Sequence, residues 1–332
     1  MSADPTTSPM GAHATTKNRP LALSLLKLAR PLQWSKGIFV LAGPVYGAAD
    51  LLGSGVPIPE IIFRSIVVLA SFSLAASGCY VINDLCDVEA DRSHPRKKNR
   101  PIASGAVTPG QAKVFAALLL IVSLGLLSLL PAPTRWWTGA TVVLYIANVM
   151  AYSAYFKKHA IADVMGLSLG FVLRVLGGCA ALGIGPSSWL LNVTLFIAMF
   201  LAFGKRLGER RSMGEAAAKT RAVQGLYTDS LLEMAVVVTG VCTLVTYTIY
   251  VEGQAEYYTL GFNLLWLTVL PVTFVLLRCI VLLDAGRYDD PTEIALRDPV
   301  VRGGTLLFSS MTAFLMLWFR LDFQSVLTDW LR

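Results

Sequence analysis

Long apolar segments separated by short polar connections run through almost the whole chain. An α-helix needs about 20 mostly apolar residues to cross the hydrocarbon layer of a bilayer. Nine stretches approach that length, so the pattern predicts an all-α, polytopic membrane protein. We expect its spans near 37–53, 61–82, 111–130, 136–155, 160–183, 189–207, 230–251, 258–282 and 303–320.

The N-terminal end of the chain departs from this pattern. Residues 1–20 are rich in Thr, Ser, Pro and Ala without an apolar core, which predicts a disordered tail and not a signal peptide. Residues 21–34 form a candidate interfacial helix. The first span, 37–53, is weakened because Gly37, Gly43, Pro44 and Gly47 interrupt it. We expect residues 21–332 to form a single transmembrane domain.

The charge distribution orients the predicted spans. Only 15% of the 332 residues are charged, and the net charge is +7. If successive spans alternate in direction, 23 of the 28 lysines and arginines fall on one side of the membrane. Positive connections stay in the cytoplasm, so we expect the N-terminus and the candidate chemistry on the cytoplasmic side. No aromatic-and-basic motif or zinc-ligand spacing supports nucleic-acid binding, and a homo-oligomer is left open.

Residues 80–105 form the most informative segment, because an apolar run gives way there to a cluster of acids. On a helix, Asn83, Asp87 and Asp91 lie four residues apart and share one face, with Asp84 beside them. Like charges stacked in this way repel each other, so the arrangement requires cations. A small number of hard oxygen ligands suits Mg²⁺, which completes its shell with water and substrate phosphates.

A basic run follows the acids. It consists of Arg92, Arg96, Lys97, Lys98 and Arg100, and these side chains can bind phosphate oxygens directly. Acids for a metal beside bases for an anion predict a magnesium–diphosphate site at a membrane surface. The alternative for the basic run alone is a solvated loop whose charge only obeys the topology rule.

Two further connections carry candidate substrate-binding residues. Tyr152 and Lys157 lie at a predicted helix end, where a hydroxyl and an ammonium group can both reach a phosphate. The alternative is an interfacial tyrosine belt with a lysine that extends to the headgroups. Lys205, with Arg206 next to it, is a candidate for binding a phosphate. Glu209 is a candidate for binding the metal or orienting a substrate hydroxyl. The alternative there is an exposed, charged helix start.

Two polar residues belong to the fifth predicted span. Asp163 lies at the start of this span. It is either a helix N-cap or an acid that orients the residues of the site without binding substrate itself. Arg174 lies 11 residues further on, about 16 Å along a helix. A buried arginine inside a span is costly and indicates a polar cavity or a bound anion. The alternative is a structural pair with an acid on a neighbouring helix.

The acidic segment resembles the first signature of the UbiA superfamily of intramembrane prenyltransferases, Asn-Asp-x-x-Asp-x-x-x-Asp. This sequence has Asn83, Asp84, Asp87 and Asp91 at those positions, and residues 100–105 also resemble the family. The resemblance implies about nine transmembrane helices bundled around a central cavity that opens to lipid and cytosol. It also implies a Mg²⁺ ion bound by Asn83, Asp87 and Asp91.

The sequence departs from the usual members of that superfamily after the sixth span. Those members carry a second Asp-rich motif there, whereas residues 205–210 read Lys-Arg-Leu-Gly-Glu-Arg. The departure resembles one branch, the decaprenyl-phosphate phosphoribosyltransferases, with similar pieces at 30–36, 87–92, 157–159, 170–174 and 293–298. That branch implies 5-phosphoribosyl pyrophosphate (PRPP) as donor, a polyprenyl phosphate as acceptor, and synthesis of cell-envelope arabinan or a glycolipid at the bacterial plasma membrane.

This interpretation gives each candidate residue a role. Asp84, Asp87 and Asp91 are expected to be catalytic, through the metal and a ribose hydroxyl. The expected substrate-binding residues are Lys36, Arg92, Arg100, Tyr152, Lys157, Arg174, Lys205, Arg206 and Glu209. One rival function is a UbiA-type aromatic prenyltransferase that uses a polyprenyl diphosphate in quinone or haem synthesis. The other is a non-enzymatic lipid or metabolite transporter.

Overall fold

Every named secondary-structure element in the described part of the chain is a helix, which confirms the predicted all-α class. The computed structural model describes residues 20–47, 51, 54–93, 97–213, 222–288, 293–294 and 297–320. Residues 1–19 of the predicted tail, Arg96 of the basic run, and 48–50 and 52–53 of the first predicted span lie outside these ranges. The single domain over 21–332 stays a prediction.

Seven helices in the described ranges are long and apolar enough to cross a membrane, so the protein is a multi-pass membrane protein. Each of them coincides with a predicted span. They are α4 (Ile58–Cys86), α6 (Pro109–Leu126), α7 (Ala132–Ala154), α8 (Ala162–Leu182), α9 (Ser188–Met213), α11 (Asp229–Gly253) and α13 (Val269–Asp284). Short 3₁₀ turns extend α6 and precede α13, at Leu127–Leu129 and Leu264–Thr268.

The first and last predicted spans differ from these seven. In the region of 37–53, helix α2 (Ile38–Tyr46) has nine residues with Pro44 inside, which gives it a length of only about 14 Å. Helix α15 (Pro299–Arg320) has 22 residues but is not among the seven. The total of nine spans therefore stays a prediction.

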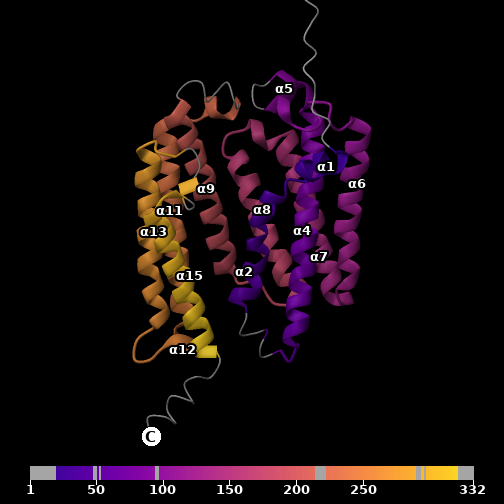
Figure 1. The fold of residues 1–332 in the computed structure, drawn as a ribbon. Helices are drawn as coiled ribbons and strands as arrows, with labels where there is room; N and C mark the ends of the chain where they lie inside the picture. The colour runs from indigo at the N-terminus through magenta and orange to yellow at the C-terminus, as the bar shows by residue number, and fades with distance from the viewer. Residues whose placement is uncertain are drawn as a thin grey trace, which may run out of the picture.

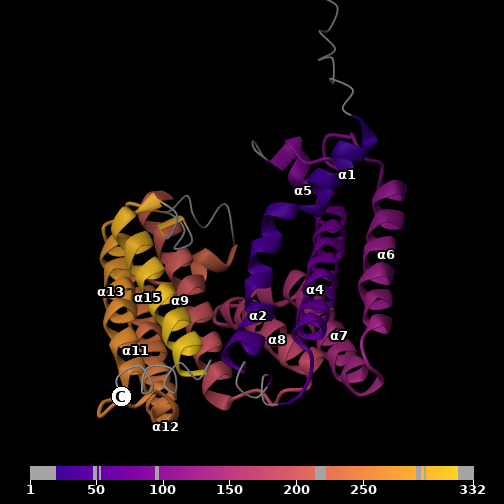
Figure 2. The same ribbon diagram turned by 60° about the horizontal axis from the view of Figure 1, so that its bottom comes forward.

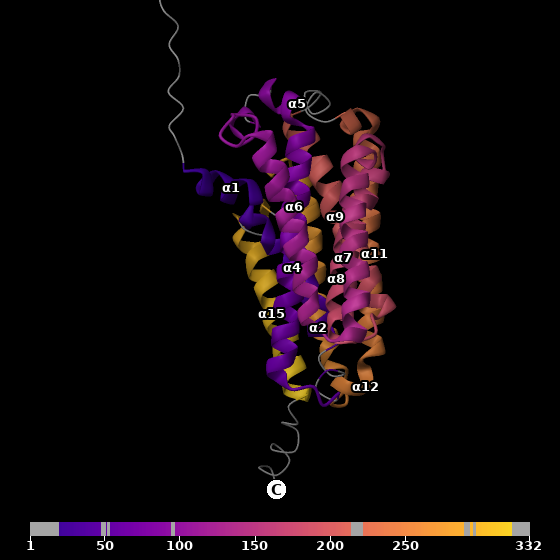
Figure 3. The ribbon, with the colours of Figure 1, turned by 90° about the vertical axis from the view of Figure 1, so that its right-hand side faces the viewer.

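A sharp backbone corner at Arg30 separates the N-terminal helix from the bundle. Helix α1 (Leu21–Ala29) ends at Arg30, whose φ of 54° is left-handed, and a 3₁₀ segment, Pro31–Gly37, leads on to α2. Figure 3 shows α1 lying across the direction of the long helices, at the same end as the short helix α5 (Val88–Ser93). Since Leu23 and Leu26 are exposed, α1 fits the predicted interfacial helix.

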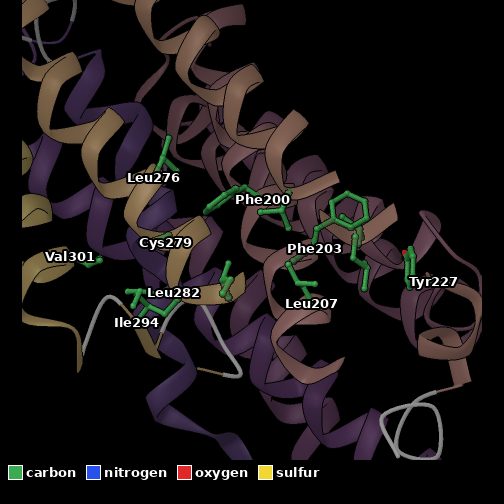
Figure 4. Close-up of a cluster of buried hydrophobic side chains, with 14 of the residues drawn as sticks. Phe200, Phe203, Leu207, Tyr227, Leu276, Cys279, Leu282, Ile294 and Val301 are labelled. Carbon is green, nitrogen blue, oxygen red and sulfur yellow. The ribbon is translucent and has the colours of Figure 1, made fainter. Parts of the chain in front are cut away.

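The long helices form two groups that meet along α8 and α9. Helices α2, α4, α6, α7 and α8 lie on one side, and α9, α11, α13 and α15 on the other (Figures 1 and 2). Each group has its own apolar core. The second group packs around Phe200, Phe203 and Leu207 of α9, together with Leu276 and Leu282 of α13 (Figure 4).

Glycines on α8 and α2 allow these two helices to pack closely against each other. A Cβ atom added at Gly178 would overlap the carbonyl oxygen of Val40 in α2, and one added at Gly43 would lie 2.5 Å from the sulfur of Cys179. Helices approach this closely only where side chains are absent from the interface. The glycines that weaken the first predicted span therefore create its packing surface.

Polar caps determine where several helices begin. Thr108 and Gln111 form a capping box at the start of α6, with Pro109 in the first helical position. Asp298 accepts hydrogen bonds from the backbone N–H groups of Val300 and Val301 at the start of α15. These N–H bonds, that of Val301 foremost, lower the pKa of Asp298.

The contact between α2 and α8 predicts the effect of filling Gly178. The Gly178→Ala substitution should destabilise the protein by about 1–3 kcal/mol, since the new methyl group overlaps backbone that cannot rotate away. Thermal unfolding of the detergent-solubilised protein measures this loss. Gly125→Ala is the matched control, because a Cβ at Gly125 meets nothing within 4 Å. Equal melting temperatures for the two variants would contradict the packing account.

Candidate active site

The acidic segment continues the helical hydrogen-bond pattern through a break. Helix α4 ends at Cys86, which is exposed, and α5 begins at Val88. The N–H of Asp87 still donates to the carbonyl of Asn83 at 3.0 Å, and the N–H of Asp91 to that of Asp87 at 2.8 Å. The predicted four-residue period is therefore present in the backbone, although it runs through two helices and not the one expected.

Two of the three aspartates are buried and paired with arginine. Asp84 and Asp91 are each 2% exposed. One nitrogen of Arg100, Nη1, lies 3.0 Å from Asp84 Oδ1 and 2.7 Å from Asp91 Oδ2, and Arg30 Nη2 lies 2.6 Å from the same Asp84 oxygen. Buried carboxylates need such partners to remain charged. Arg100, expected to bind substrate, thus bridges two acids in this structure.

Asp87 has a different environment. Its side chain is 33% exposed, and its only ion pair in the described chain is with Lys157, whose Nζ lies 3.3 Å from Oδ1. The amide nitrogen of Asn83 donates to the other carboxylate oxygen at 3.1 Å. Asp87 is thus the most accessible of the three acids. Lys157, which the sequence predicts to bind a phosphate, is the residue that pairs with it.

The donor atoms around Asp87 fit a magnesium ion that keeps most of its water. Among the described residues, no group of three or more His, Cys, Asp or Glu side chains is arranged to hold a metal. Mg²⁺ in proteins commonly takes one or two carboxylates and fills the remaining positions with water and phosphate oxygens. Asn83 and Asp87 supply hard oxygen atoms of this kind, whereas Asp91 is occupied by Arg100.

Arg174 has aromatic partners. It is 6% exposed on α8, and its Nη2 donates to the hydroxyl of Tyr145 at 2.7 Å. Its guanidinium also lies over the rings of Tyr145 and Phe171, 4.4 and 5.7 Å from their centroids. No carboxylate in the described chain forms a salt bridge with it, so the alternative of a structural pair with an acid gains no support.

Arg206 is enclosed and does not face an open surface. It is 0% exposed, and its Nε lies 2.9 Å from Asp163 Oδ2. The hydroxyl of Tyr227 donates to the other Asp163 oxygen at 2.5 Å. Asp163 thus lies in the first turn of α8 as a buried acid that supports its surroundings, while Ile161 occupies the cap position.

The remaining candidates differ in exposure and in their described contacts. Arg92 is exposed and pairs with Glu89 three residues before it. Glu209 accepts a hydrogen bond from the side chain of Gln224 at 2.8 Å. The other three candidates are half-buried, on the 3₁₀ segment before α2, on α7 and on α9: Lys36, Tyr152 and Lys205.

Sequence reasoning missed Arg30 and Tyr227 as partners of the acids. Arg30 is 54 positions from Asp84, and Tyr227 is 64 positions from Asp163. No local spacing signals such contacts. For Arg30 two signals were available: its place before Pro31, where helices usually end, and its position in the 30–36 piece that resembles the phosphoribosyltransferase branch.

Two apolar grooves are defined on the long helices, both outside the paired acids. One, of about 350 Å³, is lined by α7, α8 and α9, and includes Asn148 and Asn192. The other, of about 550 Å³, lies between α13 and α15. A central cavity open to lipid and cytosol stays a prediction.

An all-helical membrane bundle with an Asn-Asp acid cluster at one end defines a class of intramembrane transferase. Residues 38–295 match the UbiA prenyltransferase family, and the chain belongs to that family. It is therefore an enzyme of the transferase class.

The most informative similarities are to curated bacterial proteins. The chain is 35% identical to the decaprenyl-phosphate phosphoribosyltransferase of Mycolicibacterium smegmatis, over 85% of this chain and 89% of the relative. It is 32% identical to the proteins of the same name from Corynebacterium glutamicum and Mycobacterium tuberculosis, over 85% of this chain and 83% and 90% of theirs.

Solved structures show the same fold. A UbiA homolog from Archaeoglobus fulgidus, bound to GPP and Mg²⁺, matches with a TM-score of 0.61 at 15% identity, over 89% of this chain and 98% of that one. The apo structure of a UbiA homolog from Aeropyrum pernix K1 matches with a TM-score of 0.59 at 16% identity, over 82% and 97%.

The double contact of Arg100 predicts a large loss of stability on its removal. Arg100→Ala leaves Asp91 buried without its cation, so we expect a destabilisation of about 3 kcal/mol. Thermal unfolding in detergent measures it. Arg92→Ala, which removes an exposed pair, should change stability by less than about 0.5 kcal/mol. A similarly small change for Arg100→Ala would show that Asp84 and Asp91 do not depend on this arginine.

The environment of Tyr227 predicts a pH dependence at the alkaline end. Burial first, and then the hydrogen bond to Asp163, raise the pKa of Tyr227. A raised folded-state pKa means that this contribution is complete below the ordinary tyrosine value of about 10 and is lost as the pH rises above it. The stability difference between the wild type and Tyr227→Phe should therefore shrink between pH 8 and 11 in unfolding experiments. A constant difference would contradict this.

Proposed function

We propose that this protein transfers the 5-phosphoribosyl group of PRPP to a polyprenyl phosphate of the decaprenyl type, with release of diphosphate. The observation that carries the proposal is the similarity, at 32–35% identity over 85% of the chain, to proteins named decaprenyl-phosphate phosphoribosyltransferase. We further propose a location in the bacterial plasma membrane with the N-terminus and the site on the cytoplasmic side. The product would supply cell-envelope arabinan or a glycolipid.

The charge around the site supports a donor with several phosphates. Lys157 contacts Asp87, and Lys205 stands where the usual family members carry acids. A donor with a diphosphate and a separate 5-phosphate needs one metal–acid site and additional cations. Arg206, the other cation of that segment, is turned inward to Asp163, so we now assign it to the support of the site.

Asn83 and Asp87, with Asp91 next to them, are the residues that would hold Mg²⁺. When bound, the ion would neutralise negative charge on the departing diphosphate. Lys157 is half-exposed and only 3.3 Å from Asp87, so its ammonium group is within reach of a diphosphate held there. Asp84 is fixed by two arginines and would set the position of Asp87 through α4.

The reaction itself requires little proton transfer. The bond between C1 of the ribose and the diphosphate oxygen breaks, and both electrons leave with the diphosphate. An oxygen of the polyprenyl phosphate then forms the new bond to C1. A phosphate monoester is already anionic near neutral pH, so no strong general base is needed. Lys157, Lys205, Lys36, Arg92 and Tyr152 are the proposed phosphate contacts, while Arg174 supplies a buried positive charge deeper in the bundle.

The proposal predicts a specific dependence on Asp87. Purified protein with radiolabelled PRPP and decaprenyl phosphate should form a lipid-linked phosphoribose only when Mg²⁺ is present. Asp87→Asn should lower kcat by about 100-fold or more, because the metal loses its accessible carboxylate. Glu89→Gln on the neighbouring turn, an exposed acid, is the matched control and should retain activity.

Two outcomes would contradict different parts of the proposal. Full PRPP-dependent turnover by Asp87→Asn would refute the metal role of Asp87. Absence of PRPP turnover in the wild type, together with prenylation of 4-hydroxybenzoate from a polyprenyl diphosphate, would refute the function itself. The second result would establish the aromatic prenyltransferase alternative, which the fold shared with the GPP-bound homolog keeps in view.

A further inference from the structure

The link between α7 and α8 ends in a strained backbone turn. Ile161 has φ 66° and ψ −48°, and the N–H of Ala162 donates to the carbonyl of Ala160 at 2.8 Å. Together these values define a γ-turn of the rare, strained type. A β-branched residue at positive φ is a genuine outlier, and such outliers persist only where surrounding contacts hold them.

A buried network holds this turn. The hydroxyl of Tyr227 accepts a hydrogen bond from the N–H of Ile161 at 2.8 Å and donates to Asp163 at 2.5 Å. Arg206 donates to the second oxygen of Asp163 at 2.9 Å. The tyrosine side chain is 2% exposed, the arginine and the aspartate 0%. The turn of one helix group is thus fixed by residues of the other.

The network is not arranged for stability alone. Nη1 and Nη2 of Arg206 are buried and have no hydrogen-bond partner among the residues that the structure describes, and unpaired buried donors are costly. Strain at Ile161 adds to that cost. A strained backbone and unpaired buried donors at the same place are expected where function requires a particular geometry.

The strained turn lies four residues after Lys157 on the same short link. The link is compact: the N–H of Asp163 donates to the carbonyl of His159 at 3.1 Å, and the ring of His159 stacks on Tyr155 with centroids 4.1 Å apart. Rotation at Ile161 would therefore move the link as a unit. Its displacement would separate Lys157 from Asp87, which now lie 3.3 Å apart.

We propose that Tyr227 is a positioning residue, which, with Asp163 and Arg206, holds the γ-turn at Ile161 so that Lys157 points at Asp87. This inference rests on the proposed function in one respect, because Lys157 is taken to bind the diphosphate of PRPP. In this role Tyr227 acts through the turn and not on the substrate directly. Through the turn at Ile161 and Lys157, it couples the position of α9 and of the segment before α11 to the position of the acids at the end of α4.

The first test removes one oxygen atom. Tyr227→Phe keeps the ring against Phe203, its T-shaped neighbour with centroids 6.3 Å apart, but loses both hydrogen bonds. We expect the KM for PRPP to rise about 10-fold while kcat falls less than threefold. Tyr247→Phe is the matched control, since its hydroxyl also has a buried partner, Thr268 at 2.6 Å. An unchanged KM in Tyr227→Phe would overturn the proposal.

Two further variants separate positioning from folding. Glycine adopts positive φ without strain, so Ile161→Gly combined with Tyr227→Phe should bring the KM back to within about threefold of the wild type. Ala162→Pro removes the N–H that closes the turn and disfavours positive φ at Ile161, while leaving the buried network in place. It should raise the KM as Tyr227→Phe does. Failure of the rescue, or a normal KM in Ala162→Pro, would refute the role of the turn.

A double-mutant comparison assigns the effect to Lys157. In a Lys157→Ala background, Tyr227→Phe should raise the KM no further. A full additional 10-fold rise would show that the turn acts on something else and would overturn the proposal. If Asp87→Asn is inactive and Tyr227→Phe is normal, only the positioning role fails. If the wild type does not turn over PRPP at all, the proposed function fails first.

Discussion

Charge buried in an apolar helix bundle must be neutralised nearby, and this requirement organises the end of the molecule that carries the acids. Asp84 and Asp91 are almost inaccessible, and Arg100 serves both of them while Arg30 reinforces the first. Pairing of this kind costs desolvation and is no large net source of stability. The pairing holds Asp84 and Asp91 in fixed positions. Of the three aspartates, only Asp87 is accessible, and its partner is the half-exposed Lys157.

The same requirement joins the two helix groups. Asp163 at the start of α8 meets Arg206 of α9 in a pair buried from solvent, and the glycines of α8 allow α2 to pack closely against the same helix. Helix α8 is therefore fixed laterally by packing and at one end by charge. At the end of α4, cations from three separate connections, Arg30, Arg100 and Lys157, pair with the acid cluster.

Local patterns predicted the elements well and their long-range partners poorly. Seven of the nine spans predicted from the apolar runs correspond to helices long and apolar enough to cross a membrane, because length and hydropathy are properties of each segment alone. The four-residue spacing of Asn83, Asp87 and Asp91 likewise survived in the backbone. Arg100 and Arg206 were expected to face phosphate, but the structure pairs both with acids. The local spacing of charged residues in the sequence does not show whether one of them pairs with a buried acid from a distant part of the chain. Tyr227 was missed for the same reason.

Cys86 has a practical consequence because it is the exposed cysteine, directly before Asp87, while Cys242 is half-buried and Cys79, Cys179 and Cys279 are buried. Thiolates react with reagents only where the reagent can reach them. The native protein thus carries its own attachment point for a fluorophore or spin label beside the accessible acid. Occupancy of that acid by ions or substrates becomes observable by spectroscopy in an otherwise unaltered chain.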